Sequence, residues 1–394
     1  MPARLIRDGV HAVGAVDWDR RLFDELIPLP DGTTYNSYVV QGRDKIALLD
    51  TVDPTKEQDL FRHLKELKLS RIDYLICHHA EQDHSGTIPR ILEMYHGCHV
   101  LCSPKCKEIL ETHLDVKPDR ITAVQDKETL ELGGRTLEFI NAPWVHWPDT
   151  MFTYLKEDRI LFTCDFLGAH LAASDLYAVD ETTVYHSAKR YFAEIMMPFR
   201  SNIRTHLDRI QNLAIDVICP SHGPVHNHPA FIIGAYRDWA SDQVRNEVLV
   251  PFVSMHGSVR AMVEHFTEAL IHRDVRVLPF NLTRTDLGEL AMALVDAATI
   301  VVGTPTVLVG PHPAAVSAAY LVNALRPKTK FVSLIGSFGW QGKMPETIKG
   351  LLSNLKATFL EPVVVRGYPR PEDFAALERL ADTIRDQHRA IGAR

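Results

Sequence analysis

Four side chains able to bind a metal ion stand within six residues, in the segment His79-Ala-Glu81-Gln-Asp83-His84. They follow an apolar run, Tyr74-Leu-Ile-Cys77, that predicts a buried strand. A loop after such a strand can hold several side chains in one pocket, because the sheet fixes where the loop begins. Imidazoles and carboxylates without cysteine suit iron, manganese or zinc. A solvated polar loop with two incidental histidines is the weaker interpretation.

Three later apolar stretches each end at a further candidate ligand. Leu137–Pro143 precedes His146, Ile160–Cys164 follows a hairpin turn and precedes Asp165, and Asp216–Pro220 precedes His222. A single His or Asp at a strand end is more often a cap, a turn residue or a surface group than a ligand. Four such strand ends in one half of the chain together predict one metal pocket.

The second half of the chain has a different periodicity. Apolar runs of strand length alternate with amphipathic helical segments such as Val259–His272, Ala314–Leu325 and Glu372–Ile391. This alternation predicts a doubly wound parallel sheet of five strands, with ligands bound at the carboxyl ends of the strands. The expected strands are Val248–Val253, Val275–Phe280, Thr299–Val302, Lys330–Ile335 and Phe359–Val365.

Three glycine-containing loops at these strand ends resemble the flavin site of a flavodoxin. The first opens a helix, so its backbone N–H groups and hydroxyls can surround a phosphate, and aromatic residues of the third can flank a flavin ring. The resemblance implies FMN, although Ser254-Met-His256-Gly-Ser258-Val259 replaces the more usual Ser-Met-Tyr-Gly-Asn-Thr and loses one hydroxyl and one amide. The expected contacts are Ser254, Met255, His256, Gly257, Ser258, Val259, Thr304, Pro305, Thr306, Ser337, Phe338, Gly339, Trp340 and Gly342.

Composition fits a globular protein of two or three domains. The chain has 394 residues, of which 46% are hydrophobic and 24% charged. Its net charge of −7 disfavours nucleic acid and anionic membranes as partners. The amino terminus lacks an apolar signal core, so we expect a cytoplasmic protein. The six cysteines contain no CxxC pair, which predicts reduced thiols rather than disulfides or a rubredoxin-type iron site.

The metal motifs together resemble the flavodiiron proteins, in which a metallo-β-lactamase-like domain precedes a flavodoxin-like domain. The order His-x-Glu-x-Asp-His, His-Trp-Pro-Asp-Thr-Met, Cys-Asp-Phe-Leu-Gly and Ser-His-Gly-Pro carries the resemblance. Zinc hydrolases of this fold usually have His where Glu81 stands, so Glu81 favours two irons. The resemblance implies one iron held by His79, Glu81 and His146, a second held by Asp83, His84 and His222, and Asp165 bridging the two. Some relatives keep the residue at His84 out of the coordination sphere.

The resemblance implies an αββα sandwich at residues 1–245 and an FMN-binding domain at 246–394. It implies an oxidoreductase that reduces dioxygen to water, nitric oxide to nitrous oxide, or both. Electrons would enter through FMN from rubredoxin, a reduced deazaflavin or a reductase, and would cross a head-to-tail homodimer or a dimer of dimers. The sequence does not choose between the two gases, the donors or the two oligomers.

Two other interpretations remain open. One is a zinc-dependent hydrolase with a vestigial flavodoxin domain, against which Glu81 argues. The other is a flavin electron carrier whose first domain only docks partners, against which the complete ligand set argues. The helical stretch Thr182–Leu213 carries Tyr185, His186 and Tyr191, which line either a substrate channel or a packed aromatic face.

Overall fold

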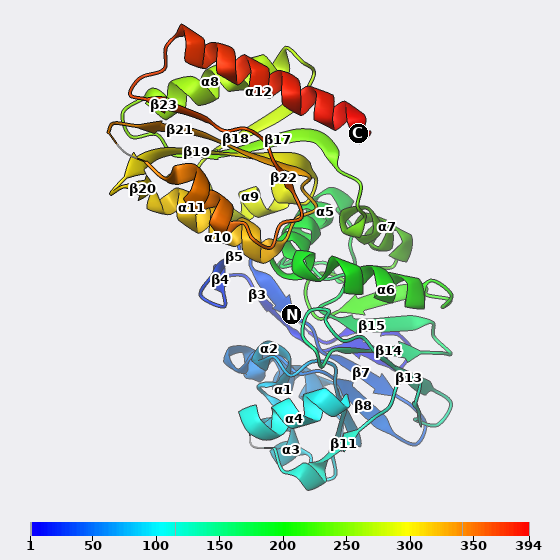
Figure 1. Cartoon of the computed structure of the whole chain (residues 1–394). Coiled ribbons are helices and arrows are strands. Elements are labelled where there is room, and N and C mark those ends of the chain that lie inside the picture. The colour runs from blue at the N-terminus through cyan, green and yellow to red at the C-terminus, as the bar shows by residue number, and fades with distance from the viewer. Residues whose placement is uncertain (1, 115, 341, 394) are drawn as a thin grey trace. The chain divides into compact units, whose positions relative to one another are not determined.

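The structure is a computed structural model that describes residues 2–114, 116–340 and 342–393. The chain forms two compact units, one of residues 1–192 and 199–240 and the other of residues 193–198 and 241–394. Figure 1 shows the helices and sheets of each unit. Within the described ranges, no helix is both long enough and apolar enough to cross a membrane.

The first unit is a sandwich of two sheets with helices on its outer faces. The first sheet has the order β1-β2-β7-β8-β9-β10-β11 and the second β12-β13-β14-β15-β16. The strands of the first sheet are Arg4–Arg7, Val10–Ala12, Tyr38–Gln41, Ile46–Leu49, Tyr74–Cys77, His99–Cys102 and Ile121–Ala123. Those of the second are Thr129–Glu131, Thr136–Asn141, Met151–Leu155, Ile160–Cys164 and Val217–Pro220. This architecture confirms the predicted αββα sandwich.

Alternating side chains explain how one sheet contacts both layers. Along β9, Leu75 and Cys77 lie in a buried cluster with the helices α1 (Glu57–Glu66), α3 (Ile88–Met94) and α4 (Pro104–His113). The intervening Ile76 lies in a second cluster, formed between the two sheets. Successive strand residues point to opposite faces, so a strand buried on both sides reads as an uninterrupted apolar run. On the other side of the sandwich lie α5 (Glu181–Tyr191), α6 (Arg200–Ile210) and α7 (Pro229–Ala240) (Figure 1).

Two small antiparallel pairs complete this unit. Strand β3 (Ala15–Asp17) pairs with β6 (Thr33–Tyr35), and β4 (Leu22–Phe23) pairs with β5 (Ile27–Pro28). Gly14, next to β3, has no room for a side chain, because a Cβ there would lie 2.1 Å from the backbone oxygen of Tyr35. The connection between β2 and β3 therefore packs closely against the end of β6.

The second unit is a parallel sheet in the order β18-β17-β19-β21-β22, which confirms the predicted doubly wound fold. Helices α8 and α12 cover one face, and α9, α10 and α11 the other (Figure 1). The strands in chain order from β17 to β19 are Arg245–Phe252, Arg276–Asn281 and Ala297–Val307, and β21 is Phe331–Phe338. The helices α8 to α12 are Ser258–Ile271, Leu287–Leu294, Pro313–Leu325, Met344–Leu351 and Pro371–Ala390. The short β20 (Gly310–Pro311) pairs with β19.

Several boundaries differ from those expected. Strands β19 and β21 continue past Gly303 and Gly336, where the sequence predicted loops. The two strands stay paired as far as Pro305 and Ser337. The expected strand Phe359–Val365 is two short strands, β22 (Thr358–Phe359) and β23 (Val363–Arg366), both paired with β21. Pro362 stands between them and has no N–H to donate to a ladder. Strand β17 begins at Arg245, one residue before the expected start of the second domain.

Candidate metal centre and flavin site

The ends of four strands bring the predicted metal-binding residues together. The segment after β9 supplies two of them directly and two more through the short helix α2 (Gln82–Ser85). The loops after β13, β15 and β16 supply the other three. The structure thus places all seven in two clusters of closely spaced donor atoms: His79, Glu81, Asp83, His84, His146, Asp165 and His222.

Asp165 lies between the two clusters, and its Oδ2 atom faces the first. This oxygen lies 3.4 Å from Nε2 of His146 and 3.7 Å from Nε2 of His79. Glu81 completes the cluster, with Oε2 3.1 Å from Nε2 of His79 and 3.2 Å from Nε2 of His146. Four donor atoms, two of nitrogen and two of oxygen, therefore converge on one point.

The Oδ1 atom of Asp165 faces the second cluster. It lies 2.9 Å from Nε2 of His84 and 3.4 Å from Nε2 of His222. Asp83 contributes Oδ2 at 3.2 Å from Nε2 of His222 and Oδ1 at 3.4 Å from Nε2 of His84. One carboxylate is thus shared by two groups of imidazole and carboxylate donors, as a bridging ligand would be.

The hydrogen-bonding state of these residues fits two metal ions. Within the described part of the chain, both oxygens of Asp83 and of Asp165 and both nitrogens of His84 are buried without a hydrogen bond of good geometry. Buried polar groups left in this way cost free energy, and the great majority in folded proteins have a partner. Two metal cations, one in each cluster, would satisfy the four carboxylate oxygens and Nε2 of His84, and would leave Nδ1 of His84 without a partner among the described residues.

Two neighbouring groups fix the orientation of the ligand imidazoles. Both oxygens of the fully buried Asp149 face Nδ1 of His79, at 3.1 and 3.2 Å, and one of them also accepts from the backbone N–H of Ala80 at 2.8 Å. Nδ1 of His222 lies 2.6 Å from the backbone oxygen of Thr34 in β6. Such partners hold a ligand ring in the tautomer that leaves Nε2 free for a metal ion. Nδ1 of His84 has no comparable partner among the described residues.

The charges of the two clusters are mutually dependent. Burial lowers the pKa of His146, but hydrogen bonds to Asp165 and Glu81 outweigh it and raise that pKa to about 9. Hydrogen bonds to Asp165 and Asp83 likewise outweigh burial and raise the pKa of His222 to about 10. Burial raises the pKa of Asp165, yet the charge of His84 and hydrogen bonds from the other imidazoles hold it well below its usual range. Asp165 is therefore anionic, as a metal ligand must be.

Aromatic rings and a neutral imidazole surround the clusters. The ring of Trp147 lies 4.8 Å from that of His79, and the ring of His170 lies 4.8 Å from that of His222. Tyr191 contacts His170 edge-on at 4.8 Å. Burial lowers the pKa of His170 well below its usual value, with a further contribution from His222, so this ring is uncharged.

Sequence reasoning missed part of this environment. Asp149 stood in the quoted motif three residues after His146, but its contact with His79 had no sequence signal, and Thr34 had none at all. Of the aromatic residues in Thr182–Leu213, Tyr191 lies beside the metal centre, whereas Tyr185 packs on Trp239 with ring centroids 5.1 Å apart. The packed aromatic face, one of the two alternatives for that stretch, thus applies to Tyr185.

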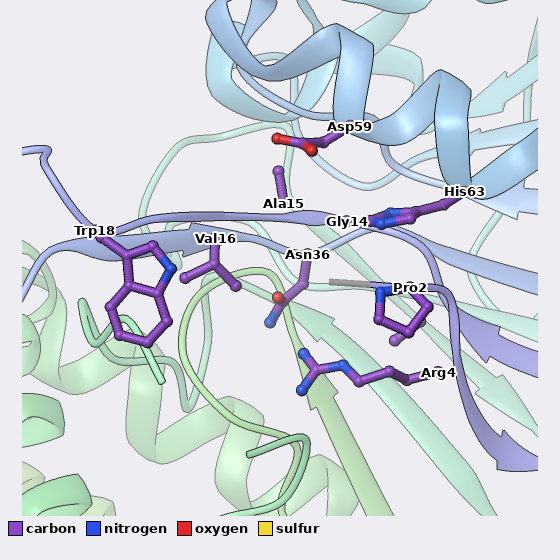
Figure 2. Close-up of a pocket in the computed structure, with 10 residues that line it drawn as sticks. Pro2, Arg4, Gly14, Ala15, Val16, Trp18, Asn36, Asp59 and His63 are labelled. Atoms are coloured by element: carbon purple, nitrogen blue, oxygen red, sulfur yellow. The ribbon is translucent and has the colours of Figure 1, made fainter. Parts of the chain in front are cut away.

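A cavity of about 240 Å³ lies near the loop that carries His222 (Figure 2). Arg4, Trp18 and Asn36 line it, and Asn36 donates from Nδ2 to the backbone oxygens of Pro220 and Gly223 at 2.9 and 2.7 Å. None of the seven metal-binding residues lines this cavity. Asn36 therefore supports this loop from outside, and the cavity is separate from the metal centre.

The expected flavin contacts lie at the carboxyl ends of three adjacent strands. Gly257 has a left-handed φ of 89° and precedes α8, and Ser254 accepts from the backbone N–H of Arg260 in the first turn. A Cβ on Gly342 would lie 2.8 Å from Oγ1 of Thr306, so the loop after β21 approaches the end of β19 closely. Oγ1 of Thr306 is buried without a hydrogen-bond partner among the described residues.

The other expected flavin contacts differ in their burial and in the hydrogen bonds that they already make. Val259 packs into the hydrophobic core and leaves its backbone N–H for a ligand. The hydroxyls of Thr304 and Ser337 donate to the backbone oxygens of Pro305 and Gly367. Trp340 is 88% exposed, Phe338 is half-buried, and Met255, His256 and Gly339 are exposed. Ser258 begins α8. Gln341, within the third loop, lies outside the described residues.

These two units define a class of protein in which a sandwich of the metallo-β-lactamase type accompanies a flavodoxin-like sheet. A family model described as "ODP family beta lactamase" matches residues 33–223. A nitric oxide reductase of Moorella thermoacetica is 36% identical over 388 residues, covering 96% of this chain and 97% of that protein. The rubredoxin-oxygen oxidoreductase of Megalodesulfovibrio gigas is 29% identical and covers 98% of both chains.

Solved structures agree with the sequence relatives. The structure of rubredoxin oxygen:oxidoreductase from Desulfovibrio gigas superimposes with a TM-score of 0.95 at 28% identity, over 100% of both chains. That of a flavodiiron protein from Giardia intestinalis gives a TM-score of 0.90 at 25% identity, over 99% of this chain and 97% of the other. The chain belongs to the flavodiiron protein family.

Replacing Asp149 by Asn tests the support of the metal centre. The amide keeps the shape of the side chain but loses the charge that holds Nδ1 of His79, so we expect metal affinity to fall by about 10- to 100-fold. Metal content after dialysis against a graded chelator series measures the effect. Asp119→Asn, at an exposed position, is the matched control. Equal metal retention in both variants would show that Asp149 does not support His79.

Proposed function

We propose that this flavodiiron protein reduces dioxygen to water, nitric oxide to nitrous oxide, or both, at a pair of non-haem irons. The central observation is that the two oxygens of Asp165 face two separate groups of donors. We assign one iron to His79, Glu81 and His146, and the other to Asp83, His84 and His222, with Asp165 shared. Two irons held by these residues would supply one electron each to a bound substrate.

The chain's own residues prepare the site for this chemistry. Anionic ligands favour the ferric state, and Glu81 adds a carboxylate to the first cluster. Asp149 and Thr34 orient the rings of His79 and His222. The surrounding rings of Trp147, Tyr191 and the neutral His170 offer little to a charged ligand, which suits a small uncharged gas.

Names of relatives support an oxidoreductase over a hydrolase. Relatives include a nitric oxide reductase, a rubredoxin-oxygen oxidoreductase and two coenzyme F420H(2) oxidases. The zinc-hydrolase interpretation is therefore not favoured. The docking-module interpretation also gives no role to the two groups of donors that share Asp165. We propose rubredoxin, a reduced deazaflavin or a reductase as the electron donor.

We propose that residues 246–394 bind FMN and pass its electrons to the metal domain, residues 1–245. Gly257 has no side chain to cap α8, so the N–H groups of Ser258 and Val259 remain for a phosphate, while that of Arg260 donates to Ser254. The altered residues His256 and Ser258 leave those backbone donors in place. The unpartnered hydroxyl of Thr306 lies at the neighbouring strand end and offers a further contact.

We further propose a head-to-tail homodimer, or a dimer of such dimers, in which FMN of one subunit serves the irons of the other. This arrangement follows from the family resemblance. It predicts that the two cofactor sites need not belong to the same chain, which a mixed dimer can test.

Replacing Glu81 by Ala removes one anionic ligand without touching either hydrophobic core. We expect iron content to fall from about two toward one per chain and gas consumption to fall with it, while the melting temperature of the chelator-treated protein stays unchanged. Glu81→His should retain less iron and more zinc. The exposed Glu93→Ala is the control. Full iron content and activity in the Ala variant would refute Glu81 as a ligand.

Replacing Gly257 by Leu tests the phosphate site. The side chain strains a residue whose φ is 89° and places bulk where the phosphate should lie, so we expect FMN to be lost. Flavin absorbance after gel filtration measures retention. Gly392→Leu introduces a comparable left-handed strain near the carboxyl terminus and should keep FMN. Wild-type flavin content in Gly257→Leu would place the phosphate elsewhere.

A mixed dimer tests electron transfer between subunits. His146→Ala should inactivate the metal site and Gly257→Leu the flavin site, so each homodimer should consume no gas. Subunit exchange should restore one working path from FMN of one chain to iron of the other. Oxygen or nitric oxide consumption after mixing measures the rescue. Heterodimers demonstrated by mass but without rescue would defeat the cross-subunit proposal.

A further inference from the structure

Three buried cysteines lie close together next to the end of β9, which leads into the loop that carries His79. Cys77 ends β9 and Cys102 ends β10, and the two residues are register partners in the parallel sheet. Cys106, in the first turns of α4, lies in the same buried core cluster. All three are inaccessible to solvent. This thiol cluster, defined as Cys77, Cys102 and Cys106, has no role in the metal or flavin chemistry described above.

Two of the thiols are already in van der Waals contact. Sγ of Cys106 lies 3.6 Å from Sγ of Cys77. A disulfide bond has a length of about 2.05 Å, so the two sulfurs need to approach by about 1.5 Å to form one. This approach would require rotation of the two side chains and a shift of α4 toward β9.

The same two cysteines are linked to the ligand His79 by two routes. Sγ of Cys77 donates to the backbone oxygen of His79 at 3.2 Å. Ser103, the N-cap of α4, accepts from the backbone N–H of Cys106 at 3.1 Å and donates to the backbone oxygen of Asp149 at 2.6 Å. Asp149 in turn holds the ring of His79. Cys77 is thus linked to His79 through its sulfur, and Cys106 through its backbone N–H, Ser103 and Asp149.

We propose that Cys77 and Cys106 are a peroxide-sensitive pair whose oxidation to a disulfide loosens the metal-binding loop. Hydrogen peroxide is the oxidant: its O–O bond breaks, the S–S bond forms, and the two thiols lose two electrons and two protons to give two molecules of water. The new bond removes the S–H donor to His79 and draws the end of β9 toward α4. The predicted result is weaker retention of the metal held by His79.

The environment of the pair makes the response slow. Burial raises the pKa of the Cys106 thiol well above its usual value, so little thiolate is present at neutral pH. Hydrogen peroxide is close to water in size and reaches the pair through local opening of the core. The pair therefore responds to sustained peroxide rather than to brief exposure.

Mass spectrometry of the holoprotein tests the bond itself. The iron- and flavin-loaded protein is treated with hydrogen peroxide, quenched with catalase, denatured in iodoacetamide and digested. We expect a peptide linking Cys77 to Cys106, with a matching loss of alkylated Cys77. Cys98, buried in the same core cluster, should stay alkylated and is the internal control. Absence of the linked peptide, or a bond from Cys106 to Cys102 instead, overturns the proposal.

A second measurement tests the effect on the metal, which rests on the proposed metal site. Peroxide should lower the iron content of the wild-type protein and of Cys98→Ala, but not that of Cys106→Ala. The Cys106→Ala protein also controls for damage caused by iron and peroxide alone. Equal iron loss in all three proteins overturns the link between the thiols and His79. A linked peptide in a protein that never held iron would instead count against the metal assignment and leave the disulfide intact.

Discussion

The fold around the metal centre depends on one buried carboxylate, Asp165. Its two oxygens lie among four imidazole nitrogens, at distances between 2.9 and 3.7 Å, in a region closed to solvent. An isolated carboxylate in such a place is very costly, and surrounding positive charge offsets that cost. Protons on the imidazoles can supply the charge, and two metal cations supply it more fully. The pairing of one carboxylate with two donor groups is therefore the basis for the proposed dinuclear site.

The rest of the first unit serves to hold this arrangement. Each ligand follows a strand, so the ladders of two sheets determine where the donors begin. The remaining freedom lies in ring orientation, and Asp149 and Thr34 remove it for His79 and His222. Nδ1 of His84 lacks such a partner among the described residues, and its buried ring packs against the rings of His79 and His222. The thiol cluster lies next to the same loop, so the proposed metal-binding region adjoins two thiols that we propose to form a disulfide.

The sequence was sufficient to find the candidate ligands that the structure brings together, because their residue types and strand-end positions are local properties. It also predicted the sandwich of the first unit and the parallel sheet of the second, since buried strands and amphipathic helices have distinct periods. It failed where long-range pairing decides the outcome. Gly303 and Gly336 predicted loops, yet β19 and β21 continue past them because each strand completes the other's hydrogen bonds. Thr34 and His222 are 188 residues apart, and the contact of Cys77 with Cys106 depends on strand register and helix packing together. None of these contacts leaves a pattern in the chain.

The central claim is that Asp165 bridges two irons. Crystals of the iron-loaded protein, measured at wavelengths just above the iron absorption edge and just below it, test this claim directly. The account predicts two anomalous peaks that disappear below the iron edge, one on each side of Asp165, with one carboxylate oxygen bound to each. A single peak, peaks that persist because the metal is zinc, or an Asp165 that binds one metal through one oxygen would contradict it.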